Sequence, residues 1–175
     1  MAHSFKDYLN VIIVILIATA VAYACGHHGL YFNKWPIIFI CMCTSFIVHW
    51  IAFIPSYLAR TEKYYDISGT LAYLCVLFMA YYLTISLSDG ILNVRSALVI
   101  TLVAIWALRL GFFLFIRVLK AGEDRRFREV KEKFSGFLVW WTISALWVFL
   151  TTVNALVTII NNVEYYDDLF LFIGL

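Results

Sequence analysis

Five long apolar stretches, joined by short connectors that hold nearly all the charged residues, dominate this sequence. Each one approaches or exceeds the roughly 20 residues that an α-helix needs to cross a hydrocarbon layer about 30 Å thick. The apolar runs are continuous, whereas the strands of a membrane barrel alternate apolar and polar residues, so helices are favoured over a β-barrel. We therefore expect membrane spans at about residues 8–24, 35–58, 67–87, 96–116 and 137–160.

The composition agrees with a membrane protein, because 64% of the residues are hydrophobic and only 14% are charged, against about half and a quarter in soluble domains. A net charge of +2, spread along the chain, argues against nucleic acid as a partner. We see no internal repeat and no linker long enough to separate domains. The sequence thus predicts an all-α, polytopic transmembrane helix bundle that forms a single domain over residues 1–175, with the lipid bilayer as its main partner.

The two ends of the chain each hold an apolar segment whose role differs from that of an ordinary span. Residues 169–175 are apolar but reach only about 10 Å as a helix, so we expect an incomplete sixth span there. The first span, followed by a small-residue stretch before Cys25, also has the features of a cleavable signal peptide. The segment is equally long enough to remain as an anchor, and the two alternatives stay open.

The lysines and arginines predict the orientation. Ten of them fall at one end of the bundle and two at the other, with Arg109 set aside inside the fourth span. Because cytoplasmic loops carry the excess of Lys and Arg, we expect the N-terminus and the loops at 59–66 and 117–136 to be cytoplasmic.

Arg109 lies at membrane depth, about 12 Å below Arg117 along the same helix. An arginine at that depth costs a few kcal/mol on insertion scales, so something must compensate for it. One explanation is that its long side chain extends to the interface. The other is a polar cavity open to the cytoplasm, where Arg109 pairs with an anionic ligand or with an acid such as Asp66. Asp66 also suits the first turn of the third helix, where the helix dipole favours negative charge.

The charged connector after the fourth span permits two interpretations. Runs of charge are usually solvated loops of the positive-inside kind. Here Glu123 and Asp124 are followed by Arg125, Arg126 and Phe127. Clustered arginines beside an aromatic residue could instead hold a phosphorylated cofactor or a lipid headgroup.

The remaining polar groups are less informative. His49, alone within the second span, is more typical of a hydrogen bond between helices than of catalysis. The four cysteines form no CxxC motif and no cluster with histidine, so no metal site is predicted. No phosphate-binding glycine loop or nucleophile motif occurs, and the sequence identifies no catalytic residue.

Two segments, YYDISGTLAYL and IWALRLGFFLFIRVLKAGEDRRF, resemble the bacterial branch of the steroid 5-alpha-reductase-like family of membrane reductases, over roughly residues 50 to 160. The family shows an acid at the start of the third span, an aromatic-x-Leu-Arg-Leu segment, a second arginine eight residues later and a Glu-Asp-x-Arg-aromatic segment. In this sequence these fall on Asp66, Trp106, Leu108, Arg109, Leu110, Arg117, Glu123, Asp124, Arg126 and Phe127.

The resemblance implies a bacterial inner-membrane reductase that uses NADPH from the cytosol and takes a lipophilic enone, steroid- or lipid-like, from the bilayer. Its cofactor-binding residues would include Arg109, Arg117, Glu123, Asp124 and Arg126. Members of the family continue into further helices with an Arg-x-Pro-Asn-Tyr-x-Gly-Glu-like segment, which does not occur here. We therefore expect a C-terminally incomplete reductase, whose fold would be completed by partner helices. The alternative is a non-enzymatic membrane protein: a truncated remnant, an assembly partner or a binder of anionic lipid.

Overall fold

The computed structural model describes residues 2–88, 90 and 92–161, so the predicted sixth span at 169–175 lies outside the described residues. The described elements are α1 (Ala2–Gly26), β1 (Tyr31–Phe32), β2 (Trp35–Pro36), α2 (Ile37–Leu58), α3 (Tyr65–Leu87), α4 (Val94–Ala121), the short 3-10 helix η1 (Arg125–Phe127) and α5 (Phe134–Asn161). The helices α1 to α5 are each long and apolar enough to cross a membrane, which confirms the predicted all-α class.

The fourth helix is longer than its apolar run. It begins where the Asn93 side chain accepts a hydrogen bond from the Ser96 amide, 2.7 Å away, and it ends at Gly122, whose φ of 79° suits a residue without a side chain. Residues 117–121 are therefore helical, and the predicted loop at 117–136 was too long at its start. The predicted loop at 59–66 was likewise too long, because α3 already begins at Tyr65. Helices can continue past the hydrocarbon layer into water. The apolar run therefore indicates which part of a helix lies in the membrane and not where the helix ends.

A small hairpin precedes α2 and was not predicted. Strands β1 and β2 pair antiparallel around Asn33, which adopts a left-handed φ of 57° that asparagine tolerates better than most residues. The second span was expected to start at Trp35, but Trp35 and Pro36 belong to the hairpin. The helix starts directly after Pro36, where the missing proline N–H costs nothing.

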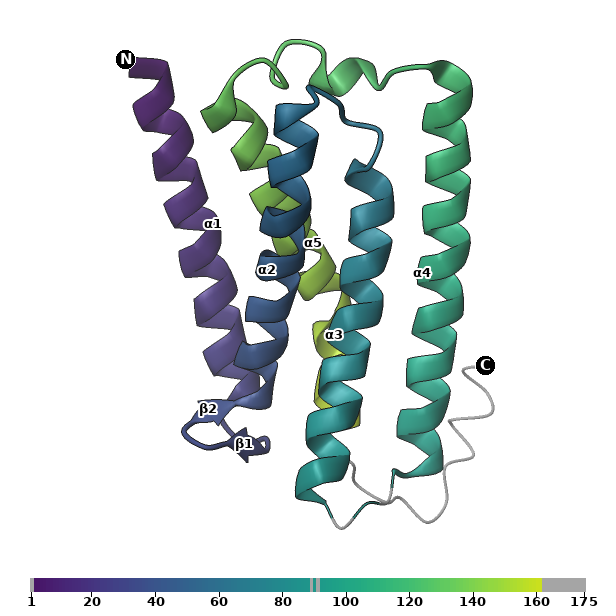
Figure 1. The fold of residues 1–175 in the computed structure, drawn as a ribbon. Helices are drawn as coiled ribbons and strands as arrows, with labels where there is room; N and C mark the ends of the chain where they lie inside the picture. The colour runs from purple at the N-terminus through teal and green to yellow at the C-terminus, as the bar shows by residue number, and fades with distance from the viewer. Residues whose placement is uncertain (1, 89, 91, 162–175) are drawn as a thin grey trace.

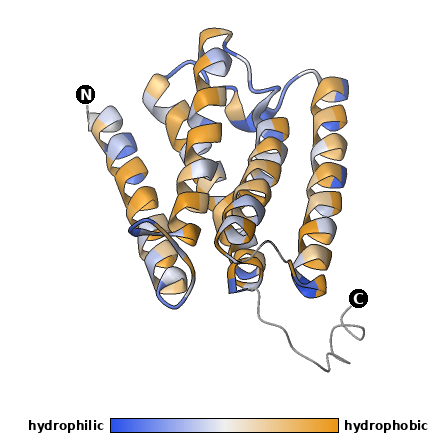
Figure 2. Ribbon diagram, turned by 60° about the horizontal axis from the view of Figure 1, so that its bottom comes forward, coloured by the Kyte–Doolittle hydropathy of each residue, from blue (hydrophilic) through white to orange (hydrophobic). Residues whose placement is uncertain are grey.

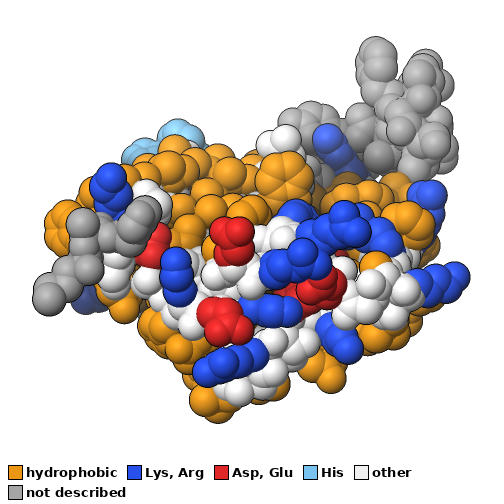
Figure 3. Space-filling view, turned by 90° about the horizontal axis from the view of Figure 1, so that it is seen from above, with side chains coloured by type: hydrophobic (Ala, Val, Ile, Leu, Met, Phe, Trp, Pro, Cys, Tyr) orange, Lys and Arg blue, Asp and Glu red, His pale blue; other side chains and the backbone are white. Residues whose placement is uncertain are grey.

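Helices α2, α3 and α5 form the centre of the bundle (Figure 1). Helix α1 packs against α2 and α5 at one edge, and α4 packs against α3 and α5 at the other. The start of α1, the α2–α3 connector and the α4–α5 connector all lie at the top of Figure 1. Seen from above, this end carries most of the visible Lys, Arg, Asp and Glu side chains (Figure 3), and we call it the charged end. The predicted grouping of these segments on one side thus agrees with the fold.

The packing and the surface both suit a bilayer. Small residues with no exposed surface, among them Ala18, Ala22, Ala80 and Ala145, allow the helix backbones to approach closely. Many large apolar side chains are instead exposed on the outside of the helices, and hydrophobic residues predominate along the helix ribbons in Figure 2. Examples at 60% exposure or more are Leu16, Ile51, Phe78, Phe113 and Trp147. An outer surface of this kind is stable against lipid and not against water, so the chain is an integral membrane protein.

Candidate functional site

Glu62, in the α2–α3 connector, organises the charged end although its own residue surface is only 3% exposed. One carboxylate oxygen accepts the Asp124 backbone N–H at 3.0 Å, and the other accepts Lys131 Nζ at 2.9 Å. Burial by itself raises the pKa of a carboxyl, but these bonds outweigh burial and hold the pKa of Glu62 below its ordinary value. The α4–α5 connector is therefore fixed onto the start of α3 by one buried charge.

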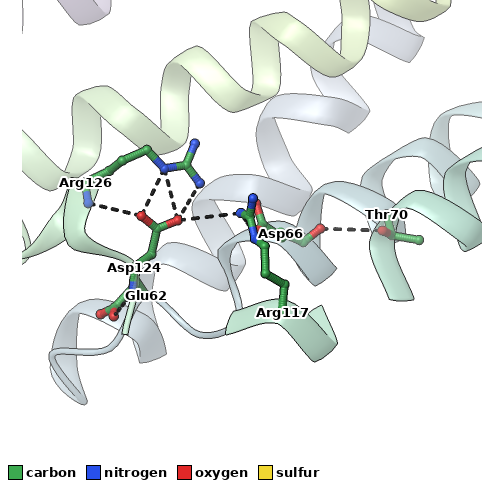
Figure 4. Close-up of polar contacts among 6 residues, drawn as sticks. All are labelled: Glu62, Asp66, Thr70, Arg117, Asp124 and Arg126. Carbon is green, nitrogen blue, oxygen red and sulfur yellow. Dashed lines mark hydrogen bonds and ion pairs between the residues drawn. The ribbon is translucent and has the colours of Figure 1, made fainter. Parts of the chain in front are cut away.

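Asp124, held in this way, lies at the centre of a chain of ion pairs (Figure 4). Its carboxylate receives Arg126 Nε at 3.0 Å and Arg126 Nη2 at 2.5 Å, the paired geometry that guanidinium and carboxylate prefer. Arg117 Nη2 lies 4.0 Å from the same carboxylate and 3.8 Å from that of Asp66. Asp66, which the sequence offered as an acid for Arg109, lies instead beside Arg117, across the gap between α3 and α4.

The contacts differ in strength. The hydrogen bond from Arg126 holds the pKa of Asp124 below its usual range, and the same bond raises the pKa of Arg126. Glu123 pairs with Arg128 in the same manner. Among the described residues, Arg117 has only the two longer ion pairs, and its side chain is 50% exposed. A bound anion could therefore draw Arg117 away from its partners at little cost.

Phe127 fixes the position of Arg126 from below. It is 1% exposed, and its ring lies 4.7 Å from that of Tyr65 and 5.4 Å from that of Trp140. The Arg126 guanidinium lies 5.5 Å from the centre of the Phe127 ring. The aromatic anchor explains why a charged connector holds a defined conformation, since the apolar ring is buried in the bundle.

A groove of about 330 Å³ runs down between α3, α4 and α5, starting beside these charges. Asp66 and Arg126 lie at its mouth, and Leu110, Leu114 and Val148 line its walls further down. Its volume is at the lower end of the range for small-molecule sites. An apolar groove with polar groups at one end suits a lipophilic molecule that carries a polar group.

Two glycines shape this groove. A Cβ at Gly111 of α4 would lie 1.7 Å from Thr70 Oγ1 and 2.8 Å from Thr70 Cβ, so this glycine sets how closely α4 approaches α3. Gly69 also lines the groove, but a Cβ there would meet nothing within 4 Å. The groove is thus closed on one side by a tight helix contact and left open beside Gly69.

A second hollow, of about 460 Å³, lies on the water-facing side of the mouth. Its charged lining consists of three arginines, Arg117, Arg125 and Arg126, and two acids, Glu123 and Asp124, and we call it the basic hollow. Arg126 lines both this basic hollow and the apolar groove. We call the region of Asp66, Arg117, Asp124 and Arg126 the mouth. It joins a surface on which arginines slightly outnumber acids to an apolar recess, and arginines and an apolar recess are what a phosphorylated cofactor and a lipid-like substrate require.

Comparison with known families now places the chain. Residues 52–169 match the family described as protein of unknown function (DUF1295). The chain belongs to the DUF1295 family. No curated protein and no solved structure matches it. The DUF1295 region covers most of the charged end and the whole lining of the groove, so both are features of the part of the chain that defines its family.

One prediction within the DUF1295 region was wrong. Arg109 is exposed on the outer face of α4, beside Trp106 and Phe113, and among the described residues it has no ion pair or hydrogen bond. Ala107 and Gly111 are buried. Residue 109 is two positions from each, about 200° around the helix, so it points away from that buried face. The expected polar cavity around Arg109 is therefore not formed by the described residues; its role in cofactor binding stays a prediction.

Some residues of the site could not be identified from the sequence. Glu62 lies in a short charged connector, and nothing in its surroundings along the chain indicates burial. Lys131, its partner 69 positions later, looked like any other lysine in a charged connector. Gly111 offered the clearest signal, because a glycine within an apolar helix often marks close packing. The described residues contain no group of three or more His, Cys, Asp or Glu that could hold a metal ion.

Proposed function

We propose that this DUF1295 protein is a membrane reductase that takes NADPH at the charged end and a lipophilic enone from the bilayer into the groove. The observation that carries the proposal is the mouth, where Arg126 lines both the basic hollow and the apolar groove. The resemblance of the third and fourth spans to steroid 5-alpha-reductase-like proteins supports the same chemistry.

The charge of the mouth fits a phosphorylated cofactor. Arg117 and Arg125 line the basic hollow. Within the part of the chain that the structure describes, long ion pairs alone hold Arg117, so it can turn toward a phosphate. Glu123 and Asp124 would act indirectly, by holding Arg128 and Arg126 in place. When bound, NADPH would supply a hydride to the β-carbon of the enone while its α-carbon takes a proton. The chain's own part is to bind the phosphates, orient the enone and keep water out of the groove; no catalytic residue is assigned.

The proposal requires the charged end to face the cytoplasm, where NADPH is available. The excess of Lys and Arg at this end predicts that orientation, and a bacterial inner membrane would be its location. In a cell, a cysteine introduced at Arg60 should then be shielded from a membrane-impermeant maleimide, while one at Lys34 should react. Labelling of position 60 but not 34 would reverse the orientation and rule out cytosolic cofactor.

Binding of NADPH to the purified protein in detergent tests the proposal without needing the substrate. Arg117→Ala should weaken NADPH binding by about tenfold, since it removes one charge-assisted contact. Arg60→Ala is the matched control, because Arg60 is exposed at the same end but pairs with Glu132, outside the mouth. Absence of NADPH binding at millimolar concentration, or equal losses in both variants, would contradict the proposal.

The second candidate is a non-enzymatic membrane protein that binds anionic lipid or a partner helix. Arg109 favours it, because this residue is exposed on the outer face of α4 with no ion pair to any described residue, and a guanidinium at that depth requires an anion or an acidic neighbour. Thermal stabilisation of the protein by anionic lipid and not by NADPH would select this function.

A further inference from the structure

The hydroxyl groups that line the groove share a property that bears on what the groove can bind. They belong to Tyr65, Thr70, Tyr73 and Ser144. A hydroxyl has one proton to donate and two lone pairs that accept. If other groups of the protein already accept all four hydroxyl protons, these positions of the groove offer a ligand only hydrogen-bond acceptors.

Tyr65 and Thr70 donate to backbone carbonyls. Tyr65 OH lies 2.9 Å from the Trp140 oxygen, and Thr70 Oγ1 lies 3.5 Å from the Asp66 oxygen. A carbonyl oxygen only accepts, so both protons point away from the groove.

Tyr73 donates as well, although its partner is another hydroxyl. Tyr73 OH lies 2.6 Å from Thr151 Oγ1. Thr151 Oγ1 in turn lies 2.8 Å from the Trp147 carbonyl oxygen, which takes its single proton. The proton between Tyr73 and Thr151 therefore comes from Tyr73.

Ser144 is held by His49, whose residue surface is fully buried. His49 Nδ1 lies 2.8 Å from the Ser45 carbonyl oxygen, so Nδ1 carries the proton of the neutral ring. Nε2 is then an acceptor, and Ser144 Oγ, 3.1 Å away, donates to it. Ser144 also lies beside the Tyr65 hydroxyl, but the Tyr65 proton goes to the Trp140 oxygen, so the Ser144 oxygen keeps a lone pair for the groove.

His49 also belongs to a set of bonds that join α2 to α5. Ser45 Oγ donates to the Ala145 oxygen at 2.9 Å, and Trp50 Nε1 donates to Thr142 Oγ1 at 3.2 Å. Of these bonded groups, only Ser144 lines the groove. The His49–Ser144 bond thus differs from its neighbours: it joins the helices and also fixes which way a groove hydroxyl points.

We propose that the groove binds a lipophilic alcohol, whose hydroxyl donates to Ser144 Oγ. A ketone at this position would need the Ser144 proton for itself, and His49 Nε2 would be left buried without a donor. A carbonyl group is accommodated instead at the mouth, where Arg126 donates. The ligand is therefore an apolar molecule with a hydroxyl inside the bundle, and the proposal concerns binding alone, whether or not that molecule is reduced.

The Ser144–His49 pair is not a nucleophile and base for acyl transfer. That chemistry requires backbone N–H groups or side-chain donors aimed at the developing oxyanion. Ser144 lies ten residues into α5, where the amides are used within the helix. The pair therefore selects a ligand that donates a hydrogen bond, and it does not act as a nucleophile and base.

The proposal is tested with two probes that share a bicyclic skeleton, decalol and decalone. Their binding to the cofactor-free protein is measured in detergent. Comparison with Gly69→Leu, which fills the groove, separates groove binding from partition into micelles. Wild type should bind decalol about tenfold more tightly than decalone, as one hydrogen bond allows. Ser144→Ala should remove this preference, whereas Ser135→Ala should keep it, because the Ser135 hydroxyl bonds Asp7 outside the groove.

The wild-type comparison decides the proposal even if Ser144→Ala does not fold. Equal binding of both probes, or tighter binding of decalone, would overturn it. Retention of the decalol preference in Ser144→Ala would do the same. Because no cofactor is present, failure here would leave the NADPH site unaffected, and failure of NADPH binding would leave the alcohol site unaffected.

Discussion

At the scale of single residues, the account depends on a buried acid that few sequence patterns would reveal. Glu62 is placed where its charge is matched twice, by Lys131 Nζ and by the Asp124 amide. Removing one partner of a buried pair leaves the other without compensation, so Glu62→Gln should destabilise the folded protein by about 2–3 kcal/mol. Thermal unfolding in detergent measures this; a change no larger than that of exposed Glu129→Gln would show that the buried pair contributes nothing.

The same acid predicts how stability depends on pH. The pKa of both Glu62 and Asp124 is lowered in the folded state, so the unfolded chain binds more protons at mildly acidic pH. Their stabilisation is fully present above the ordinary carboxyl pKa of about 4–4.5 and is lost as the pH falls below it. The melting temperature should therefore be flat from neutral pH down to about 5 and then decrease, and Glu62→Gln should make that decrease smaller. A decrease of equal size in wild type and variant would remove Glu62 as its cause.

Arg109 gives the opposite prediction, because it is exposed without a partner among the described residues. Arg109→Leu should leave the melting temperature of the cofactor-free protein unchanged or raise it, since a lipid-facing guanidinium is unfavourable. Arg117→Leu, which breaks the contacts to Asp66 and Asp124, is the comparison and should lower it. Marked destabilisation by Arg109→Leu would mean that Arg109 has a partner within the fold after all.

At the scale of helices, the sequence predicted well where the spanning helices lie and less well which face of each helix is buried. Continuous apolar runs identified all five spanning helices, because the bilayer sets a minimum length. The ends differed where α4 continues to Ala121 past its apolar run and where Trp35 joins a hairpin. Arg109 was misplaced because the sequence shows which residues share a helix face, and only the packing of α3 shows which face is covered.

The two groove glycines provide a matched test of helix packing. Gly111→Ala would bring a methyl group within 1.7 Å of Thr70 Oγ1 and should force α4 away from α3, at a cost of about 1–3 kcal/mol. Gly69→Ala meets open space and should stabilise α3 by about 0.5–1 kcal/mol through its better helix propensity. Unfolding of the two variants side by side checks the prediction. If both behave alike, the close α3–α4 contact is not formed.

At the scale of the whole molecule, the mouth brings together segments that lie far apart in the chain. Asp66, Arg117 and Arg126 come from α3, α4 and the connector before α5, and Glu62 holds that connector in place. The sequence singled out Asp66, Arg117 and Arg126 through its resemblance to the reductase family, and it did not single out Glu62. It could not indicate that they surround one opening, because that depends on the buried Glu62–Lys131 pair and on the Phe127 anchor.

The most direct measurement of the central claim is transfer of deuterium from labelled NADPH to an enone at this mouth. The protein in lipid nanodiscs would be given NADPH deuterated at the transferring position and octalone, a bicyclic enone, and the product analysed by mass spectrometry. The account predicts one deuterium in the saturated ketone for wild type, slower transfer for Arg117→Ala when NADPH is below saturation, and none for Gly69→Leu. Unlabelled octalone recovered from wild-type protein that binds both NADPH and decalol would contradict it, because both molecules would then be bound without meeting at the mouth.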